Sequence, residues 1–113
     1  MGLNSLTKRK DFNKVYKGGK TVVDKYLVIY CLPNDIGITR FGFSVGKKIG
    51  NAVMRNRIKR IMREICRTNC DIIKEGFDCV IIVRPRIKES PDYKNMEKSF
   101  FNLAARAGLI RKS

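Results

Sequence analysis

Residues 43–63 read FSVGKKIGNAVMRNRIKRIMR, and this stretch predicts a strand end, a glycine-bounded loop and an amphipathic helix in succession. Asn51 directly follows Gly50 and is a favoured N-cap residue, so we expect the helix to occupy about residues 51–68. Apolar side chains recur along it at helical spacing, at Met54, Ile58, Ile61, Met62 and Ile65. One arc of this helix is therefore expected to pack against a core.

The opposite arc of the same helix is basic. Residues 47–67 hold eight Lys and Arg residues and one Glu, which is nearly half of the net charge of +15. Solvated helix faces usually mix both signs, and guanidinium groups grip phosphate oxygens in pairs. We therefore expect this arc to recognise the backbone and shape of a folded RNA. The candidate RNA-binding residues are Lys47, Lys48, Arg55, Asn56, Arg57, Lys59, Arg60, Arg63 and Arg67.

The whole chain has the length of one domain, and we expect residues 1–113 to form a single RNA-binding domain. Hydrophobic residues make up 43% of it, which is typical of a folded chain rather than a disordered basic tail. A compact body with a net charge of +15 repels itself, and such a charge is typical of proteins that bind a polyanion. Nucleic acid is the first candidate partner, and an anionic membrane surface is the second.

The composition excludes several functions. The chain has no His, so Ser-His-Asp catalysis and His-based metal sites are absent. No segment approaches the roughly 20 apolar residues that a membrane span needs. The first ten residues, MGLNSLTKRK, lack the apolar core of a secretory signal. We therefore expect a cytoplasmic protein that has no membrane partner.

Four cysteines are present, and their placement favours free thiols. Cys31 and Cys79 lie in apolar, strand-like runs, where a free Cys behaves as a small hydrophobic residue. Cys66 and Cys70 lie one helical turn apart. A zinc site would need all four of them at irregular spacing. We therefore expect reduced cysteines and no metal site.

The N-terminal half is predicted to be one helix followed by strands. The helix is expected at about residues 8–17, with Thr7 as its N-cap and Gly18-Gly19 at its end. Residues 20–32 and 39–45 are rich in β-branched and aromatic side chains, and turn residues separate them. This pattern predicts an antiparallel hairpin, with the alternative that Val22 and Val23 form a separate short strand at its start.

The C-terminal half is predicted to add a strand and a helix. The continuous apolar character of residues 77–83 is typical of a central strand that is buried on both faces. Ser90 as N-cap and Pro91 as first helical residue predict the start of the last helix. Its apolar face comprises Met96, Phe100, Leu103, Ala104 and Ala107. The order of elements predicts an α+β fold with helices packed on one sheet.

Five aromatic residues suggest a second site. Phe12 and Tyr16 lie one helical turn apart, while Tyr30, Phe41 and Phe43 lie on predicted strands. Aromatic rings among Lys residues can stack on the bases of a single strand, and they can equally form part of a core. Strand alternation places Phe41 and Phe43 on one face of the sheet. Phe12 and Tyr16 are the stronger candidates for binding.

Residues 43–63 closely resemble the signature of the bacterial ribonuclease P protein subunit, and Arg55-Asn56-Arg57 is its most specific part. An early D-F-x-x-V-Y with a Gly pair, and a late strand that ends in Arg84-Pro85, resemble the same family. The resemblance covers essentially the whole chain. It implies an α-β-β-β-α-β-α sandwich like that of ribosomal proteins, with one mixed four-stranded sheet and a left-handed βαβ crossover. General rules of chain handedness would instead predict a right-handed one.

The resemblance also implies a function. The chain would be the protein subunit of an endoribonuclease that removes the 5′ leader from precursor tRNA. The RNA subunit would carry the required Mg²⁺ ions and perform the hydrolysis, with no cofactor and no further protein partner for this chain. The lack of His agrees with a protein that performs no chemistry itself.

The resemblance assigns roles to the candidate residues. The residues that match the family's motif for contacting the catalytic RNA are Arg55, Asn56, Arg57, Lys59, Arg60 and Arg63, and Lys47 and Lys48 match the basic pair before it. Phe12 and Tyr16 match aromatic residues of a cleft that holds the single-stranded leader, and Tyr30 matches a strand position that faces this cleft. Two departures are Gly46, where many members have Ser, and Tyr16, where Phe is common.

Three other readings remain possible at this point. A ribosomal or other structural RNA-binding protein shares the basic α+β character, but it would not stimulate cleavage of precursor tRNA. A basic helix on a membrane surface would bind anionic vesicles in preference to RNA. A protein nuclease that uses Asp71, Glu75 or Asp78 would cleave without any RNA subunit.

Overall fold

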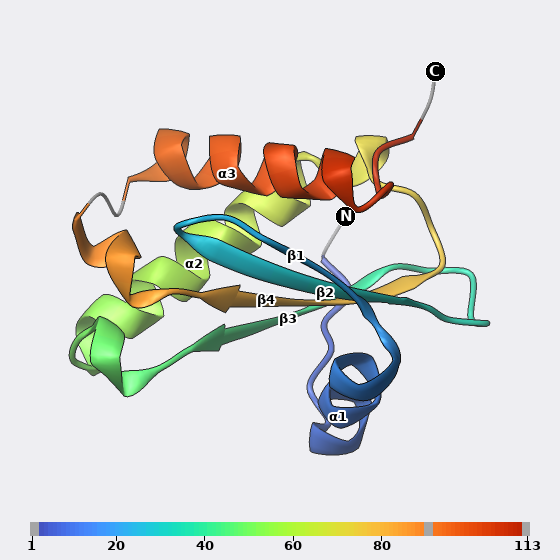
Figure 1. Cartoon of the computed structure of the whole chain (residues 1–113), viewed down its shortest axis with the longest axis horizontal. Helices are drawn as coiled ribbons and strands as arrows, with labels where there is room; N and C mark the ends of the chain where they lie inside the picture. The colour runs from blue at the N-terminus through green and yellow to red at the C-terminus, as the bar shows by residue number, and fades with distance from the viewer. Residues whose placement is uncertain (1–2, 90–91, 112–113) are drawn as a thin grey trace.

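The computed structural model describes residues 3–89 and 92–111, and its elements follow the predicted order (Figure 1). The helices are α1 (Arg9–Gly18), α2 (Ala52–Thr68) and α3 (Tyr93–Arg106), and the strands are β1 (Lys20–Val23), β2 (Leu27–Pro33), β3 (Arg40–Val45) and β4 (Phe77–Val83). Short 3₁₀ turns follow β3, α2 and β4: η1 (Lys47–Ile49), η2 (Cys70–Ile72) and η3 (Pro85–Glu89). The predicted α+β class is confirmed.

The four strands form one mixed sheet in the order β1-β2-β4-β3. β2 pairs antiparallel with β1 and with β4, whereas β3 pairs parallel with β4. The predicted hairpin between residues 20–32 and 39–45 is therefore wrong, because β4 lies between β2 and β3. The apolar side chains on both faces of β4 are buried or half-buried in this central position, and β2 instead forms its hairpin with β1.

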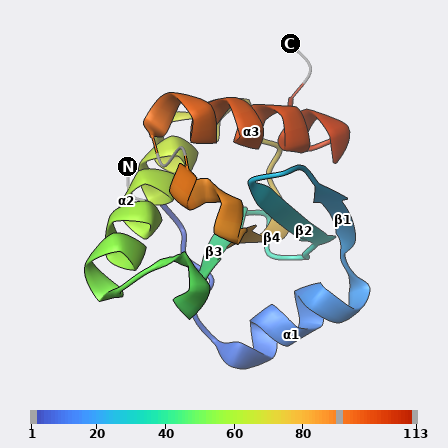
Figure 2. The same cartoon turned by 60° about the vertical axis from the view of Figure 1, so that its left-hand side comes forward.

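The connection from β3 through α2 to β4 is left-handed, as the family resemblance implies. Strands β3 and β4 both point toward the viewer in Figure 2, with β4 to the right of β3 and α2 on the upper side of the sheet. This arrangement is the rare mirror image of the usual crossover between adjacent parallel strands.

The two faces of the sheet are covered differently. Helices α2 and α3 lie on one side and α1 lies alone on the other (Figure 1). On β4, Cys79, Ile81 and Val83 belong to the core beneath α2 and α3, while Val80 and Ile82 pack on the α1 side. This alternation confirms the prediction of a central strand buried on both faces.

The helix ends follow the local sequence with two corrections. Asn51 caps α2 as predicted, since its side chain accepts a hydrogen bond from the Met54 amide at 3.0 Å. Lys8, not Thr7, occupies the N-cap position of α1, and no side chain caps that helix. The N-cap of α3 is Asp92, whose carboxylate accepts from the Asn95 amide at 2.8 Å. The predicted start at Ser90-Pro91 lies outside the described residues.

Candidate nucleic-acid interface

The predicted basic residues lie on one continuous surface of η1 and α2. We call Lys47, Lys48, Arg55, Asn56, Arg57, Lys59, Arg60, Arg63 and Arg67 the basic surface. All are exposed except Arg55 and Lys59, which are half-buried at the margin of the core. Residues on the opposite arc of α2 are buried, namely Ile58, Met62, Ile65 and Cys66. Helical periodicity alone thus separates the two arcs, because residues three and four apart share a side.

Most cations of the basic surface have no carboxylate partner. Glu64 and Arg67 form a two-point ion pair one turn apart, with the Arg67 Nε donating at 3.0 Å. This hydrogen bond from Arg67 lowers the pKa of Glu64. Within residues 3–89 and 92–111, no ion pair involves any other cation of the basic surface. Their charge is therefore available to an external anion, whereas that of Arg67 is largely neutralised.

One aromatic contact holds the basic surface beside β3. The Arg63 guanidinium lies over the Phe43 ring, 6.0 Å from its centroid. The Arg55 Nε is buried and has no hydrogen-bond partner among the described residues. Arginine stacked on an aromatic ring keeps its N–H groups free in the plane of the guanidinium. The contact with Phe43 directs the Arg63 guanidinium toward β3.

The sheet separates the five aromatic residues into two groups. Phe41 is buried and packs on Phe100 of α3, with the ring centroids 6.5 Å apart. Phe43 packs against the same core. The prediction that these two share a face is confirmed, and that face is the one beneath α2 and α3. They are therefore core residues rather than a stacking platform.

The other three aromatic residues meet on the α1 side. Tyr16 lies edge-on to Tyr30 of β2, with centroids 5.1 Å apart, and Phe12 lies 6.4 Å from Tyr16. We call Phe12, Tyr16 and Tyr30 the aromatic surface. Strand register places half-buried Val28 and Ile82 beside it on the same face. The structure thus brings together three of the five aromatic residues that the sequence analysis grouped as a second site.

Tyr16 is the most exposed ring of this group, at 37%. Partial burial and the neighbouring Tyr30 raise its pKa, although a hydrogen bond with Ser44 of β3 opposes the rise. The phenol is therefore neutral at physiological pH. It offers a ring face for stacking and a hydroxyl for hydrogen bonding.

An ion pair beside α1 was missed by the sequence analysis. Arg40 of β3 donates two hydrogen bonds to Asp78 of β4, at 2.8 and 2.7 Å, and Asn34 donates a third at 2.9 Å. Burial would raise the pKa of Asp78, but the hydrogen bonds from Arg40 and Asn34 and the charge of Arg40 outweigh it and lower the pKa. Arg40 also lies 3.8 Å from Asp11 of α1. No local signal pairs residues 38 positions apart.

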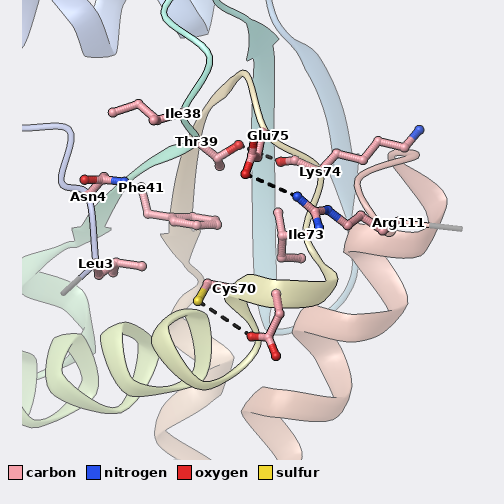
Figure 3. A pocket seen from close by; sticks show the side chains of 11 residues that line it. Leu3, Asn4, Ile38, Thr39, Phe41, Cys70, Ile73, Lys74, Glu75 and Arg111 are labelled. Carbon is pink, nitrogen blue, oxygen red and sulfur yellow. Dashed lines mark hydrogen bonds and ion pairs between the residues drawn. The ribbon is translucent and has the colours of Figure 1, made fainter. Parts of the chain in front are cut away.

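The carboxylates proposed for a protein nuclease do not form a catalytic cluster. Asp78 is engaged by Arg40, as described above. Asp71 and Glu75 line a cavity of about 340 Å³ at the end of the sheet where β3 and β4 begin; there Glu75 pairs with Arg111 at 3.2 Å and the Cys70 thiol lies 3.8 Å from Asp71 (Figure 3). Among the described residues, no three His, Cys, Asp or Glu side chains are placed to hold a metal ion. None of the described helices is long and apolar enough to cross a membrane.

The two candidate surfaces lie on opposite sides of the sheet and share β3. Arg63 covers Phe43 on one face of this strand, while Tyr16 lies close to Ser44, the next residue, on the other face. A mixed sheet with a left-handed crossover, an arginine-rich helix and an exposed aromatic group together define a small α+β protein of the RNA-binding class.

Comparisons with known proteins place the chain more narrowly. The family model for Ribonuclease P matches residues 2–108. The chain is 46% identical to the ribonuclease P protein component of Clostridioides difficile over 105 residues, which cover 92% of this chain and 91% of that one. The structure is similar to the RNase P protein of Staphylococcus aureus (TM-score 0.86, 32% identity, 95% of this chain and 97% of that one). It is also similar to the protein from Thermotoga maritima (TM-score 0.83, 35% identity, 91% and 96%).

The chain therefore belongs to the ribonuclease P protein family, whose members are protein components of the endoribonuclease that processes the 5′ end of precursor tRNA. The resemblance found in residues 43–63 is confirmed. Membership implies partnership with the RNase P RNA.

Proposed function

We propose that the basic surface binds the catalytic RNA subunit and that the aromatic surface binds the single-stranded 5′ leader of precursor tRNA. The RNA-subunit part of this proposal rests on the row of cations on α2, from Arg55 to Arg63, for which the described part of the chain offers no carboxylate partner. Since β3 lies between the two surfaces, one small protein would contact the RNA subunit and the leader at the same time.

The basic surface supplies positive charge where two RNAs must approach each other. Each guanidinium that contacts phosphate releases counterions, so binding is strong at low salt and weakens steeply as salt rises. Arg57, Arg60 and Arg63 are exposed and carry this role. Arg67 contributes less because Glu64 already neutralises it.

The aromatic surface distinguishes precursor from product. A base stacked on an aromatic side chain contributes about 1–3 kcal/mol of binding free energy. Only the precursor carries a leader, so only the precursor gains this energy, and mature tRNA is released. Tyr16 and Tyr30 are the proposed stacking residues, and Phe12 packs beside them.

The protein itself holds no catalytic residue in this proposal. The RNA subunit carries the Mg²⁺ ions and performs the phosphodiester hydrolysis, while the protein reduces phosphate repulsion near them. The chain acts as a single RNA-binding domain in the cytoplasm and needs no cofactor of its own and no further protein partner.

The test is a leader-length series with the reconstituted holoenzyme. Precursor tRNAs with leaders of different lengths, and mature tRNA, are titrated against holoenzyme that contains wild-type protein, Tyr16→Ala or Tyr30→Ala. We expect both variants to weaken binding of long-leader precursor by about fivefold or more per lost base contact, and to leave mature tRNA unchanged.

Tyr93→Ala is the matched control, because Tyr93 lies on α3, near Thr68 of α2 and on the opposite side of the sheet. It should leave the leader series unchanged. Equal weakening of precursor and mature tRNA by Tyr16→Ala would show that the aromatic surface does not bind the leader.

A further inference from the structure

A glycine in the middle of β3 is explained by a single side chain of α1. A β-carbon added to Gly42 would lie 2.4 Å from the Cζ atom of Phe12 and 2.9 Å from its Cε1 atom. These distances are shorter than any normal carbon–carbon contact. The tip of the Phe12 ring therefore occupies the space that a side chain at Gly42 would need.

Backbone conformation does not account for this glycine. Gly42 pairs with Val80 inside regular parallel sheet, and its φ is not positive. Glycine in the interior of a strand is unfavourable, because it loses more conformational entropy on folding and offers no side chain to pack. A close approach by another group is the usual reason for such a residue, and here that group is Phe12.

Helix α1 rests on three successive same-face positions of β3. Asp11 lies 3.8 Å from the Arg40 guanidinium, the Phe12 ring lies against Gly42, and the Tyr16 side chain lies close to Ser44. Arg40, Gly42 and Ser44 alternate along β3 with residues that face α2, as strand periodicity requires. The contact of Phe12 with Gly42 is the middle one of these three contacts, so it sets the height of α1 above the sheet. The height of α1 in turn places Tyr16 against Tyr30.

We propose that Gly42 is a positioning residue for leader binding: it seats Phe12 on β3 and thereby holds Tyr16 edge-on to Tyr30. This inference rests on the proposal that the aromatic surface binds the leader. Gly42 itself contacts no RNA and acts through Phe12.

The contact between Phe12 and Gly42 lies outside the main core. A substitution at Gly42 is therefore expected to change the position of the Phe12 ring more than the free energy of unfolding. Phe12 is half-buried and packs on a small cluster of Leu6, Val15 and Val80. A methyl group at Gly42 pushes the ring tip away from the sheet, which the exposed side of α1 permits. The spacing of Tyr16 and Tyr30 changes as a result.

The experiment is the same holoenzyme titration with Gly42→Ala protein. We expect its affinity for long-leader precursor to fall by about fivefold or more, the loss of one stacked base, with leaderless tRNA and RNA-subunit affinity unchanged. Gly46→Ala is the matched control, because Gly46 is exposed and no atom lies within 4 Å of a β-carbon added there. It should behave as wild type. Unchanged leader affinity in a folded Gly42→Ala protein would overturn the proposal.

A double variant separates positioning from general damage. If Gly42 acts only by seating Phe12, then Gly42→Ala causes no further loss of leader affinity in a Phe12→Ala background. A further loss there would overturn the proposal. Should Gly42→Ala alone fail to fold, the double variant removes the clash and must fold; its failure would show that the methyl group strikes something other than Phe12.

The failure of this inference is distinguishable from failure of the proposed function. If Tyr16→Ala leaves the leader preference intact, the aromatic surface does not bind the leader. If Tyr16→Ala removes the preference and Gly42→Ala does not, the leader site stands and only the role of Gly42 is wrong.

Discussion

The two faces of the sheet differ in how completely helices cover them. Beneath α2 and α3 lies a large buried core in which Phe100, Met62 and Ile81 are fully enclosed. On the α1 side the described residues bury only the small cluster of Leu6, Val15 and Val80, and Tyr16 remains 37% exposed beside it. The two faces therefore have different roles. The face with two helices stabilises the fold, and the face with one short helix keeps aromatic rings available for a ligand.

Two phenylalanines on opposite faces provide the sharpest test of this comparison. Phe100→Ala empties a fully buried site and is expected to lower the free energy of unfolding by about 3–5 kcal/mol. Phe12→Ala removes a half-buried ring and is expected to lower it by about 1–2 kcal/mol. Urea denaturation of the two variants measures both values. Equal losses would mean that the α1 face is as important for stability as the other.

The outer side of α2 is expected to affect binding without affecting folding. Replacing Arg57, Arg60 and Arg63 together by Ala should weaken binding to the RNA subunit by roughly 100- to 1,000-fold at about 0.1 M salt. The slope of log K against log salt should decrease by about three. Filter binding across a salt series measures both effects, while the urea midpoint should stay near that of wild type.

Removal of the same charge elsewhere is the control for this effect. Lys25, Lys94 and Lys98 are exposed and lie outside the basic surface. Their triple replacement by Ala changes the net charge equally and should weaken binding far less. A similar loss from both triple variants would assign RNA binding to overall charge rather than to α2.

The ion pair beside α1 is expected to make a smaller, pH-dependent contribution. The pKa of Asp78 is lowered in the folded protein, so its stabilising effect is present above the ordinary Asp pKa of about 4 and is lost as the pH falls through the lowered value. Asp78→Asn should cost about 1–3 kcal/mol at neutral pH, and progressively less in acid. Urea midpoints measured between pH 7 and pH 2 test this sign. A difference that stays constant with pH would exclude the charge of Asp78 as its cause.

The reactivity of the cysteines shows how tightly the core beneath α2 and α3 is closed. This prediction involves little change in the stability of the protein. Cys31, Cys66 and Cys79 all lie in the core beneath α2 and α3, and burial raises the pKa of each thiol. Cys70 is exposed. Iodoacetamide should therefore modify Cys70 first in the native protein and all four in denaturant. Rapid native modification of a second cysteine would show that this face opens readily.

Local sequence was a good guide wherever one segment carries its own signal. The cap at Asn51, the apolar arc of α2 and the double burial of β4 were all predicted, because periodicity and capping depend on residues a few positions apart. The basic surface was predicted on the same ground, since the apolar arc defines the opposite one. The left-handed crossover came from family resemblance alone, against the general rule.

The order of the strands in the sheet could not be predicted from such local patterns. Turn residues between β2 and β3 suggested a hairpin, yet β4, more than thirty residues later, pairs with both strands. That pairing decides which aromatic residues become core and which remain exposed. It also brings Arg40 to Asp78 and Gly42 beneath Phe12, contacts that no short pattern encodes.

The pattern of residues along the chain was therefore enough to identify the helices, the basic surface and the family. Its charge and periodicity are local properties that survive in any arrangement of the strands. The aromatic surface and the contact of Phe12 with Gly42 exist only after the sheet is assembled, because they join α1, β2 and β3 across its face. Contacts between distant segments depend on which strand occupies the centre, and burial of β4 on both sides made that choice.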